Sequence, residues 1–215
     1  MFPKVLIPTD LSAASATVVE RIAEVPGVRE VILFHALRSS TGLSPADEET
    51  LQRMQETVQR QGYPAVVVVE DGMAGVPARI LQTATERDVD LIAMGVRDPG
   101  LLRNLFSGNV AATVLRDAHV HVLILPQSAR RGPPLGARLL VPTDLSDPAP
   151  EIRSLLRESD GEGMAILLHV VEPGRTEQEA RDRLEALRAE LAPLRRDVEA
   201  MARTGDPART TCAVA

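Results

Sequence analysis

A short pattern that occurs twice constrains the fold of this chain more than any other feature. Residues 5–12 read VLIPTDLS and residues 139–146 read LLVPTDLS, an offset of 134 positions. The same offset aligns VILFHAL at residues 31–37 with AILLHVV at residues 165–171. Because two separate segments agree at one offset, the chain is predicted to contain an internal repeat of one structural unit. Residues 127–137, QSARRGPPLGA, are polar and rich in Pro and Gly, and are predicted to link the two copies.

The first copy, residues 1–126, alternates short apolar runs with helical patterns. Such alternation indicates βαβ units, whose strands lie parallel in one sheet. Right-handed crossovers then favour a doubly wound open sheet of the α/β class. The predicted strands are residues 4–8, 30–37, 65–69, 89–94 and 120–125, and the predicted helices are residues 12–23, 45–60, 76–87 and 110–118.

The second copy, residues 138–215, is predicted to be incomplete. After its second strand, residues 176–203 have a helical pattern interrupted by Pro193, and residues 210–214 resemble a third strand. No second glycine loop follows, so the first strand of this copy is expected to have an open edge, which either pairs with another molecule or is covered by the helix of residues 184–201. Six apolar residues of the helical stretch have coiled-coil spacing, but a crossover helix packed on the sheet is the favoured interpretation. The six are Leu184, Leu187, Leu191, Leu194, Val198 and Met201.

Composition excludes several classes of function. A net charge of −6 over 215 residues argues against non-specific binding to nucleic acid. No apolar run approaches the ~20 residues of a membrane span. The N-terminal sequence MFPKVLIPTD lacks the layout of a signal peptide. A single cysteine, Cys212, cannot form an intrachain disulfide, which fits a reducing compartment. We therefore expect a cytoplasmic protein without a membrane or nucleic-acid partner.

A loop of sixteen residues, MGVRDPGLLRNLFSGN at positions 94–109, follows the predicted fourth strand. Gly95 closes the strand, and Gly108 and Asn109 open the helical pattern of residues 110–118. A strand, a glycine turn and a helix N-terminus form an anion site, because backbone N–H groups point outward and the helix dipole favours negative charge. The loop is therefore predicted to bind an anionic group such as a phosphate.

The spacing within this loop resembles the nucleotide loop of the universal stress protein family. ATP-binding members carry Gly, two residues, Gly, nine residues, Gly, and then Ser or Thr. The chain matches this pattern at Gly95 and Gly108, and departs from it at Asp98 and Asn109. A carboxylate about 4 Å from a phosphate repels it by a few kcal/mol unless Mg²⁺ bridges the two groups. Asn can begin a helix as well as Ser does, so the second departure keeps the helix start.

The resemblance to universal stress proteins covers residues 1–126 throughout, and residues 138–215 look like the first part of a second such domain. The Pro-Thr-Asp strand end at residues 8–10 and the DLIAMG segment at residues 90–95 carry it, together with the loop. It implies a five-stranded α/β sheet in the order 3-2-1-4-5. It also implies cytoplasmic stress-response proteins that form homodimers, often through the last strand.

The resemblance also implies a site for an adenine nucleotide, ATP or AMP with Mg²⁺, beside the first and fourth strands. Ligands of open α/β sheets bind outside the carboxyl ends of the strands, where the strand order reverses. Asp10 would contact the adenine or its ribose edge, in a base pocket formed by Pro8, Thr9 and Ala36. The residues expected beside the ribose and phosphates are Met94, Gly95, Arg97, Gly108, Asn109 and Val110.

Four histidines and a second aspartate allow other interpretations. His35 and His169 end matching strands, where a histidine that bonds to the backbone is favoured over an acid–base group. His119 and His121 share a strand face, but no third ligand is evident nearby, so no metal site is assigned. Asp144, the counterpart of Asp10, is expected in a turn or helix cap rather than against a ligand.

Three functions follow from these observations. The first is a regulatory module that binds ATP or AMP and acts in a stress response through assembly. The second is a stress protein with a vestigial loop that acts by protein–protein association without nucleotide. The third is a slow ATPase, although no residue is identified that would orient the attacking water, so no catalytic residue is assigned.

Overall fold

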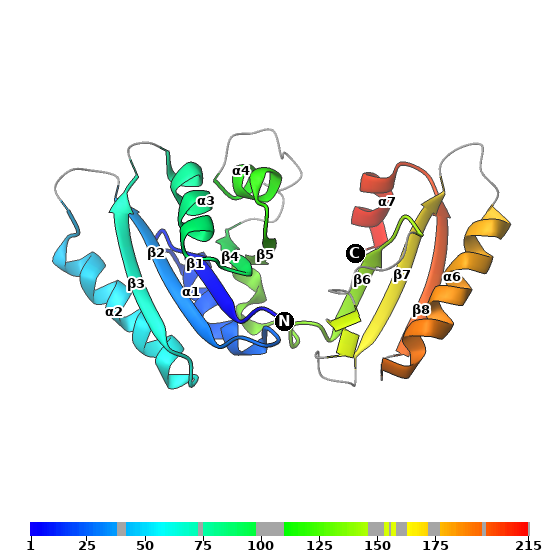
Figure 1. The fold of residues 1–215 in the computed structure, drawn as a ribbon, viewed down its shortest axis with the longest axis horizontal. Helices are drawn as coiled ribbons and strands as arrows, with labels where there is room; N and C mark the ends of the chain where they lie inside the picture. The colour runs from blue at the N-terminus through cyan, green and yellow to red at the C-terminus, as the bar shows by residue number, and fades with distance from the viewer. Residues whose placement is uncertain are drawn as a thin grey trace. The chain divides into compact units, whose positions relative to one another are not determined.

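The chain forms two compact units, Met1–Pro133 and Pro134–Ala215, which we describe separately (Figure 1). No helix in the described part of the chain is both long and apolar enough to cross a membrane. The computed structural model describes residues 1–37, 42–72, 75–97, 110–145, 153–154, 156–157, 163–171, 177–194 and 197–214.

The first unit is built on one sheet of parallel strands in the order β3-β2-β1-β4-β5. This arrangement confirms the predicted α/β class and the predicted strand order. The inner strands read as continuous apolar runs because helices cover both faces of the sheet. The strands are β1 (Lys4–Pro8), β2 (Glu30–Leu37), β3 (Ala65–Asp71), β4 (Leu91–Val96) and β5 (His121–Pro126).

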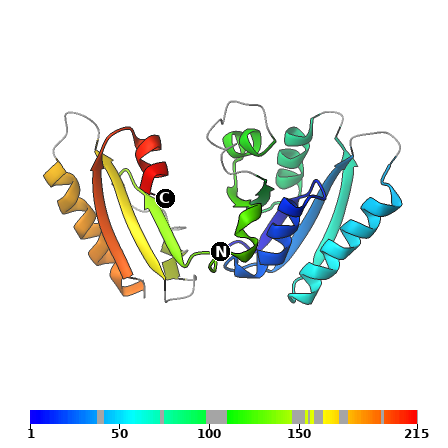
Figure 2. The same cartoon turned by 180° about the vertical axis from the view of Figure 1, so that it is seen from behind.

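Helices form a layer on each face of this sheet (Figures 1 and 2). α1 (Ala13–Arg21) and α2 (Pro45–Arg60) pack together on one face, and α3 (Val76–Glu86) and α4 (Val110–Asp117) pack together on the other. Alternate strand side chains point to opposite faces, so each strand contributes to both layers. The core under α3 and α4 includes Leu6, Ile32, Phe34, Ile80, Ile92 and Val114, all almost completely buried.

A short 3-10 helix, η3 (Gln127–Arg131), follows β5 and packs against α1. The buried guanidinium of Arg21 on α1 donates to the carbonyl oxygens of Ala129 (2.7 Å) and Pro133 (2.6 Å). It also forms an ion pair with Glu24 at 2.5 Å. The first part of the segment expected to link the copies is therefore anchored on the first unit.

The second unit contains a sheet of parallel strands in the order β6-β7-β8. The strands are β6 (Arg138–Pro142), β7 (Met164–Val171) and β8 (Asp197–Thr204), and the helical segments are α6 (Glu177–Leu191), η4 (Ala192–Leu194) and α7 (Pro207–Val214). β6 and β7 repeat the pairing of β1 and β2. The core of this unit includes Val141, Leu156, Ala165, Leu167, Leu184, Leu191 and Val198.

Two predictions for the second copy are wrong. The helix expected over residues 176–203 ends in η4, because Pro193 has no N–H to continue helical bonding. The chain then enters β8, so the apolar stripe lies partly on a helix and partly on a strand: Val198 and Met201 belong to β8. Residues 210–214, expected as a strand, lie in α7.

The start of α7 explains the second error. The Asp206 carboxylate accepts a hydrogen bond from the backbone N–H of Arg209 at 2.9 Å, and Pro207 is the first helical residue. An aspartate followed by proline is a typical helix start. The β-branched residues of the TTCAV segment favoured the strand interpretation, but this cap and the packing of α7 on β7 produce a helix.

Candidate functional site

A cavity of about 180 Å³ lies at the carboxyl ends of β1, β2 and β4 in the first unit. It is at the point where the strand order reverses, since β1 lies between β2 and β4. Open α/β sheets bind ligands at such a position. Its lining residues are Pro8, Thr9, Asp10, Ser15, Phe34, His35, Ala36, Val76, Ile80, Met94, Gly95, Val110 and Ala111.

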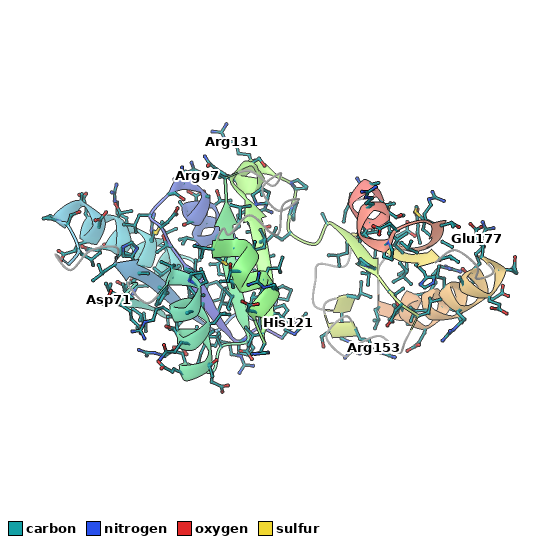
Figure 3. The ribbon with its side chains drawn as sticks, turned by 90° about the horizontal axis from the view of Figure 1, so that it is seen from above. Asp71, Arg97, His121, Arg131, Arg153 and Glu177 are labelled. Carbon is teal, nitrogen blue, oxygen red and sulfur yellow. The ribbon has the colours of Figure 1, made fainter. Side chains whose placement is uncertain are left out.

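Seven of the ten residues expected at the nucleotide site line this one cavity. They are Pro8, Thr9, Asp10, Ala36, Met94, Gly95 and Val110. Arg97, the eighth, directly follows β4 and is labelled in Figure 3. Gly108 and Asn109 lie outside the described residues, as does Asp98. The described residues thus include all those expected around the base. Of those expected beside the ribose and phosphates, they include Met94, Gly95, Arg97 and Val110.

A tight turn after β1 positions Asp10. The Thr9 N–H donates to the Phe34 carbonyl oxygen (2.8 Å), and the Thr9 hydroxyl accepts from the Leu11 N–H (2.9 Å). Leu11 has a φ of 65°, an uncommon value for a residue with a side chain. The reversal carries the chain from the strand end directly into α1 and leaves Asp10 exposed at the mouth of the cavity.

The Asp10 carboxylate is held from one side only. Its Oδ1 atom accepts hydrogen bonds from the Ser15 hydroxyl (2.7 Å) and the Ser12 N–H (3.1 Å). Within the part of the chain that the structure describes, no hydrogen bond reaches Oδ2. The carboxylate is therefore fixed in place and retains an oxygen that can accept from a ligand.

The surroundings of Asp10 favour its ionised form. Partial burial raises its pKa, but hydrogen bonds from Ser12 and Ser15 and the positive charge of Arg97 lower it, and the net pKa lies below the ordinary value. The buried Ser12 hydroxyl makes no hydrogen bond to a described group, so we ascribe the Ser12 contribution to its N–H. Asp10 is thus an anion at neutral pH.

His35 forms part of the cavity wall, and its ring is already bonded to the backbone. Its Nδ1 atom lies 2.9 Å from the Thr9 carbonyl oxygen. A carbonyl oxygen only accepts, so Nδ1 carries the proton and, in the neutral ring, Nε2 is the acceptor. This contact confirms the prediction of a strand-end histidine satisfied by the backbone.

Gly95 is required by packing as well as by any ligand. A Cβ atom at this position would lie 2.1 Å from the Ala14 carbonyl oxygen and 2.7 Å from the Ser15 nitrogen. β4 therefore approaches the backbone of α1 too closely for a side chain. The same closeness places Ser15 against Asp10, so the strand–helix contact helps to build the cavity.

Sequence reasoning missed six residues that line the cavity: Ser15, Phe34, His35, Val76, Ile80 and Ala111. Val76, Ile80 and Ala111 come from the N-terminal halves of α3 and α4. Ser15 could have been found, because it lies one helical turn beyond Leu11 and the turn brings its hydroxyl back to Asp10.

His119 and His121 were expected on one strand face, but β5 begins at His121, so His119 precedes the strand. Among the described residues, no three His, Cys, Asp or Glu side chains are grouped to hold a metal ion. The ring of His121 instead packs edge-on against Phe2, with ring centroids 5.3 Å apart. Its position on β5 is labelled in Figure 3.

The fold and this cavity define a doubly wound α/β protein with a small-molecule site at its topological switch point. The sequence profile of the Universal stress protein family matches residues 1–126, more than half of the chain. The chain therefore belongs to the universal stress protein family. No protein of curated function matches it in sequence.

Solved structures extend this likeness to the second unit. A universal stress protein from Archaeoglobus fulgidus is 26% identical, with 100% of this chain and 83% of that chain aligned at a TM-score of 0.71. Another structure, the universal stress protein from Archaeoglobus fulgidus in complex with dAMP, is 23% identical. The alignment covers 58% of this chain and 97% of that chain, with a TM-score of 0.44. A universal stress protein family protein from Arabidopsis thaliana with AMP bound is 16% identical. The alignment covers 60% of this chain and 95% of that chain, with a TM-score of 0.44.

Proposed function

We propose that the first unit is a regulatory module that binds an adenine nucleotide, ATP or AMP, in the cavity beside β1 and β4. The observation that carries this proposal is the cavity itself: an apolar slot with one fixed carboxylate at its mouth, at the switch point of the sheet.

The slot suits a flat, weakly polar base. Ala36, Ile80 and Met94 line it with apolar side chains that are each less than a tenth exposed. Its volume of about 180 Å³ is below the ~300 Å³ at the lower end of small-molecule sites, so it accommodates a base rather than a whole nucleotide. The sugar and phosphates would extend toward Arg97 and the N-terminus of α4, where positive charge and helix dipole favour an anion.

Asp10 suits recognition of the sugar. An ionised carboxylate is an acceptor only, and vicinal ribose hydroxyls are donors, so Oδ2 can accept from the ligand while Oδ1 stays bonded to Ser15. A hydrogen bond to a charged acceptor contributes about 1.5–3 kcal/mol, against roughly 0.5–1.5 kcal/mol for a neutral one. Asp10 would therefore supply a substantial part of the affinity.

Calorimetric titration of the full chain with ATP, AMP and GTP tests this proposal. Asp10→Asn keeps the shape of the turn but removes the charge, and we expect about tenfold weaker binding of ATP and AMP. Asp144→Asn makes the same change at the matching position of the second unit and should leave ATP affinity unchanged. Equal ATP affinity in Asp10→Asn and wild type, or no ATP and AMP binding at all, would refute the site.

Mg²⁺ provides a second arm of this titration. Asp98 adds a carboxylate to the loop that is expected beside the phosphates, although its structure lies outside the described residues. A divalent cation can bridge a carboxylate and a triphosphate, and it has less to bridge in AMP. We therefore expect Mg²⁺ to tighten ATP binding more than AMP binding.

We also propose that the protein acts as a homodimer that pairs through β5. β5 is an edge strand of the first sheet, and most of its side chains are only partly buried. An edge strand offers unpaired backbone groups to another chain, and twofold contacts are the commonest oligomeric symmetry. In such a dimer, nucleotide binding would act on partner proteins through the assembled form.

A further inference from the structure

β6 of the second unit is the counterpart of β1, and the turn after it repeats the turn that positions Asp10. The Thr143 N–H donates to the Leu168 carbonyl oxygen (2.9 Å), and the Thr143 hydroxyl accepts from the Leu145 N–H (3.0 Å). Leu145 has a φ of 66°, against 65° at the matching position of the first unit. The Nδ1 atom of His169 lies 2.8 Å from the Thr143 carbonyl oxygen, which confirms the prediction of a strand-end histidine bonded to the backbone.

A cavity of about 440 Å³ lies beside this turn. Its lining residues are Pro142, Thr143, Asp144, Leu168, His169, Val170, Pro207 and Thr211. The first six correspond, at the offset of 134, to residues that line the cavity of the first unit, and the last two belong to α7. The repeat thus extends to the side chains around the turn, which makes β1 a direct reference for β6.

The two strands differ in their second neighbour. β1 lies between β2 and β4, whereas β6 pairs with β7 alone among the described strands. At the start of β1, the Lys4 N–H donates to the Asp90 carboxylate (2.8 Å), and the Lys4 carbonyl oxygen accepts from the Asp90 N–H (2.9 Å). Arg138 takes the place of Lys4 in β6. The side of β6 that corresponds to the β4 side of β1 is therefore an open edge of the described sheet.

This open edge leaves apolar side chains of β6 partly exposed. Val5, Leu6 and Ile7 of β1 are completely buried. The matching residues Leu139 and Leu140 of β6 are only partly buried. A further strand beside β6 would cover them, as β4 covers β1.

The helix that was the alternative cover for this edge lies elsewhere in the described part of the second unit. α6 packs on β7 and β8, and Leu184 and Leu191 belong to the core that they form (Figure 1). The last residues of the predicted helix are in β8. Of the two outcomes expected for the edge, pairing with another molecule is the one that this arrangement favours.

The backbone groups on the open edge come from alternate residues of β6. The Thr143 N–H and the Ala137 carbonyl oxygen both bond to β7. Successive residues of a strand direct their N–H and C=O groups to opposite sides, so Arg138, Leu140 and Pro142 direct theirs to the open edge. Pro142 offers a carbonyl oxygen there but no N–H.

We propose that the open edge of β6 pairs antiparallel with β6 of a second copy of this chain, about a twofold axis through Leu140. In this register Leu140 lies opposite its own copy, and each Leu140 N–H donates to the other Leu140 carbonyl oxygen. Each Arg138 N–H donates to the Pro142 carbonyl oxygen of the other copy. The donor that Pro142 lacks is needed only at the two ends of the paired strands.

The side chains of β6 suit the same partner. Leu139 would lie opposite Val141 of the other copy on the core face of the sheet, and the two Leu140 side chains would meet on the other face. Arg138 is the one charged residue of β6, and it would lie opposite Pro142, so no like charges meet. Twofold contacts between identical surfaces are also the commonest oligomeric symmetry.

Disulfide formation between two copies of the full chain tests this pairing, in a Cys212→Ser background. Leu140→Cys would place two thiols on directly opposite residues, whose Cα atoms lie about 5.5 Å apart in an antiparallel pair. Disulfides span Cα separations of roughly 4.4–6.8 Å. Arg138→Cys is the matched control on the same face of β6, because its two copies would be four residues apart along the strand, or about 14 Å.

On oxidation we expect Leu140→Cys to form a covalent dimer at least about tenfold faster than Arg138→Cys, since Cα atoms more than roughly 7 Å apart cannot be bridged without backbone movement. Leu140→Pro provides an independent check. It removes an N–H that faces the edge and not β7, and proline is tolerated on edge strands, so this variant should fold. The Arg138 amide proton should exchange slowly with solvent in wild type and rapidly in Leu140→Pro.

Two outcomes would overturn the inference: equal rates of covalent dimer formation in Leu140→Cys and Arg138→Cys, or slow exchange of the Arg138 amide in both wild type and Leu140→Pro. The second outcome would show that another segment of the same chain covers the edge. The result is separable from the pairing proposed for β5. If β5 did not pair, the Leu140→Cys disulfide would still form, because it reports on the second unit alone.

Discussion

Replacing Gly95 by alanine should destabilise the first unit sharply, because the added methyl group meets backbone and not a movable side chain. The Cβ would lie 2.1 Å from the Ala14 carbonyl oxygen and 2.3 Å from its carbonyl carbon. An ordinary contact would require β4 and α1 to separate by about 1 Å. Overpacking in cores costs about 1–3 kcal/mol, and we expect the upper end of that range because two backbones must move. At ~2–4 °C per kcal/mol for a chain of this size, the melting temperature should fall by about 10 °C.

Urea unfolding followed by tyrosine fluorescence is the suitable assay for Gly95→Ala. Tyr63 is the single tyrosine of a chain without tryptophan, and it lies in the first unit, so its signal reports on that unit. Gly132→Ala is the matched control, because Gly132 has a φ of −75° and its nearest neighbour to an added Cβ is 3.3 Å away. That variant should stay within about 1 kcal/mol of wild type. If Gly95→Ala matches this control, the close approach of β4 and α1 is not what requires glycine.

Three further predictions follow from the described contacts. Arg21→Ala removes the donors to Ala129, Pro133 and Glu24. The free energy of unfolding in urea should fall by about 2 kcal/mol and not more, since the Glu24 carboxylate is partly exposed and can bind water instead. An unchanged free energy of unfolding would show that other contacts hold η3. The pKa of Asp10 is lowered by folding, so its contribution to stability is present above the ordinary value of 3.8 and is lost as the pH falls through the folded value. The stability difference between wild type and Asp10→Asn should therefore shrink only in acid, and a difference that is constant from pH 7 to pH 3 would contradict the assignment. Light scattering at micromolar concentration should give twice the chain mass of 23.2 kDa, whereas a monomer would refute pairing through β5.

The strands of the first unit could be predicted because each is an apolar run buried on both faces of the sheet. An apolar run of this kind can be recognised as a strand from its own residues, as in β2, whose sequence is EVILFHAL. β8 carries no such signal: its sequence, DVEAMART, has a single well-buried residue, Val198. It is a strand because its backbone pairs with the edge of β7, and no local pattern in the sequence predicts that pairing.

The candidate site likewise has one part that the sequence predicts and another that depends on tertiary packing. The Thr9–Asp10–Leu11 turn is encoded within a few residues, since the hydroxyl, the carboxylate and their backbone donors all lie on one short segment. This is why the PTDLS pattern identified the position of Asp10 from sequence alone. The roles of Ile80 and Ala111 depend on where α3 and α4 pack, which is a property of the whole unit and leaves no spacing to recognise.

The two cavities show what a repeat can duplicate and what it cannot. Duplicating the PTDLS segment and the following strand also duplicates the turn, the aspartate and the histidine contact, because those features are formed by the two segments alone. The rest of each lining comes from later segments, which are α3, β4 and α4 in the first unit and α7 in the second. The part of each cavity that the repeated turn forms is therefore the same in both units, while the rest of the lining differs.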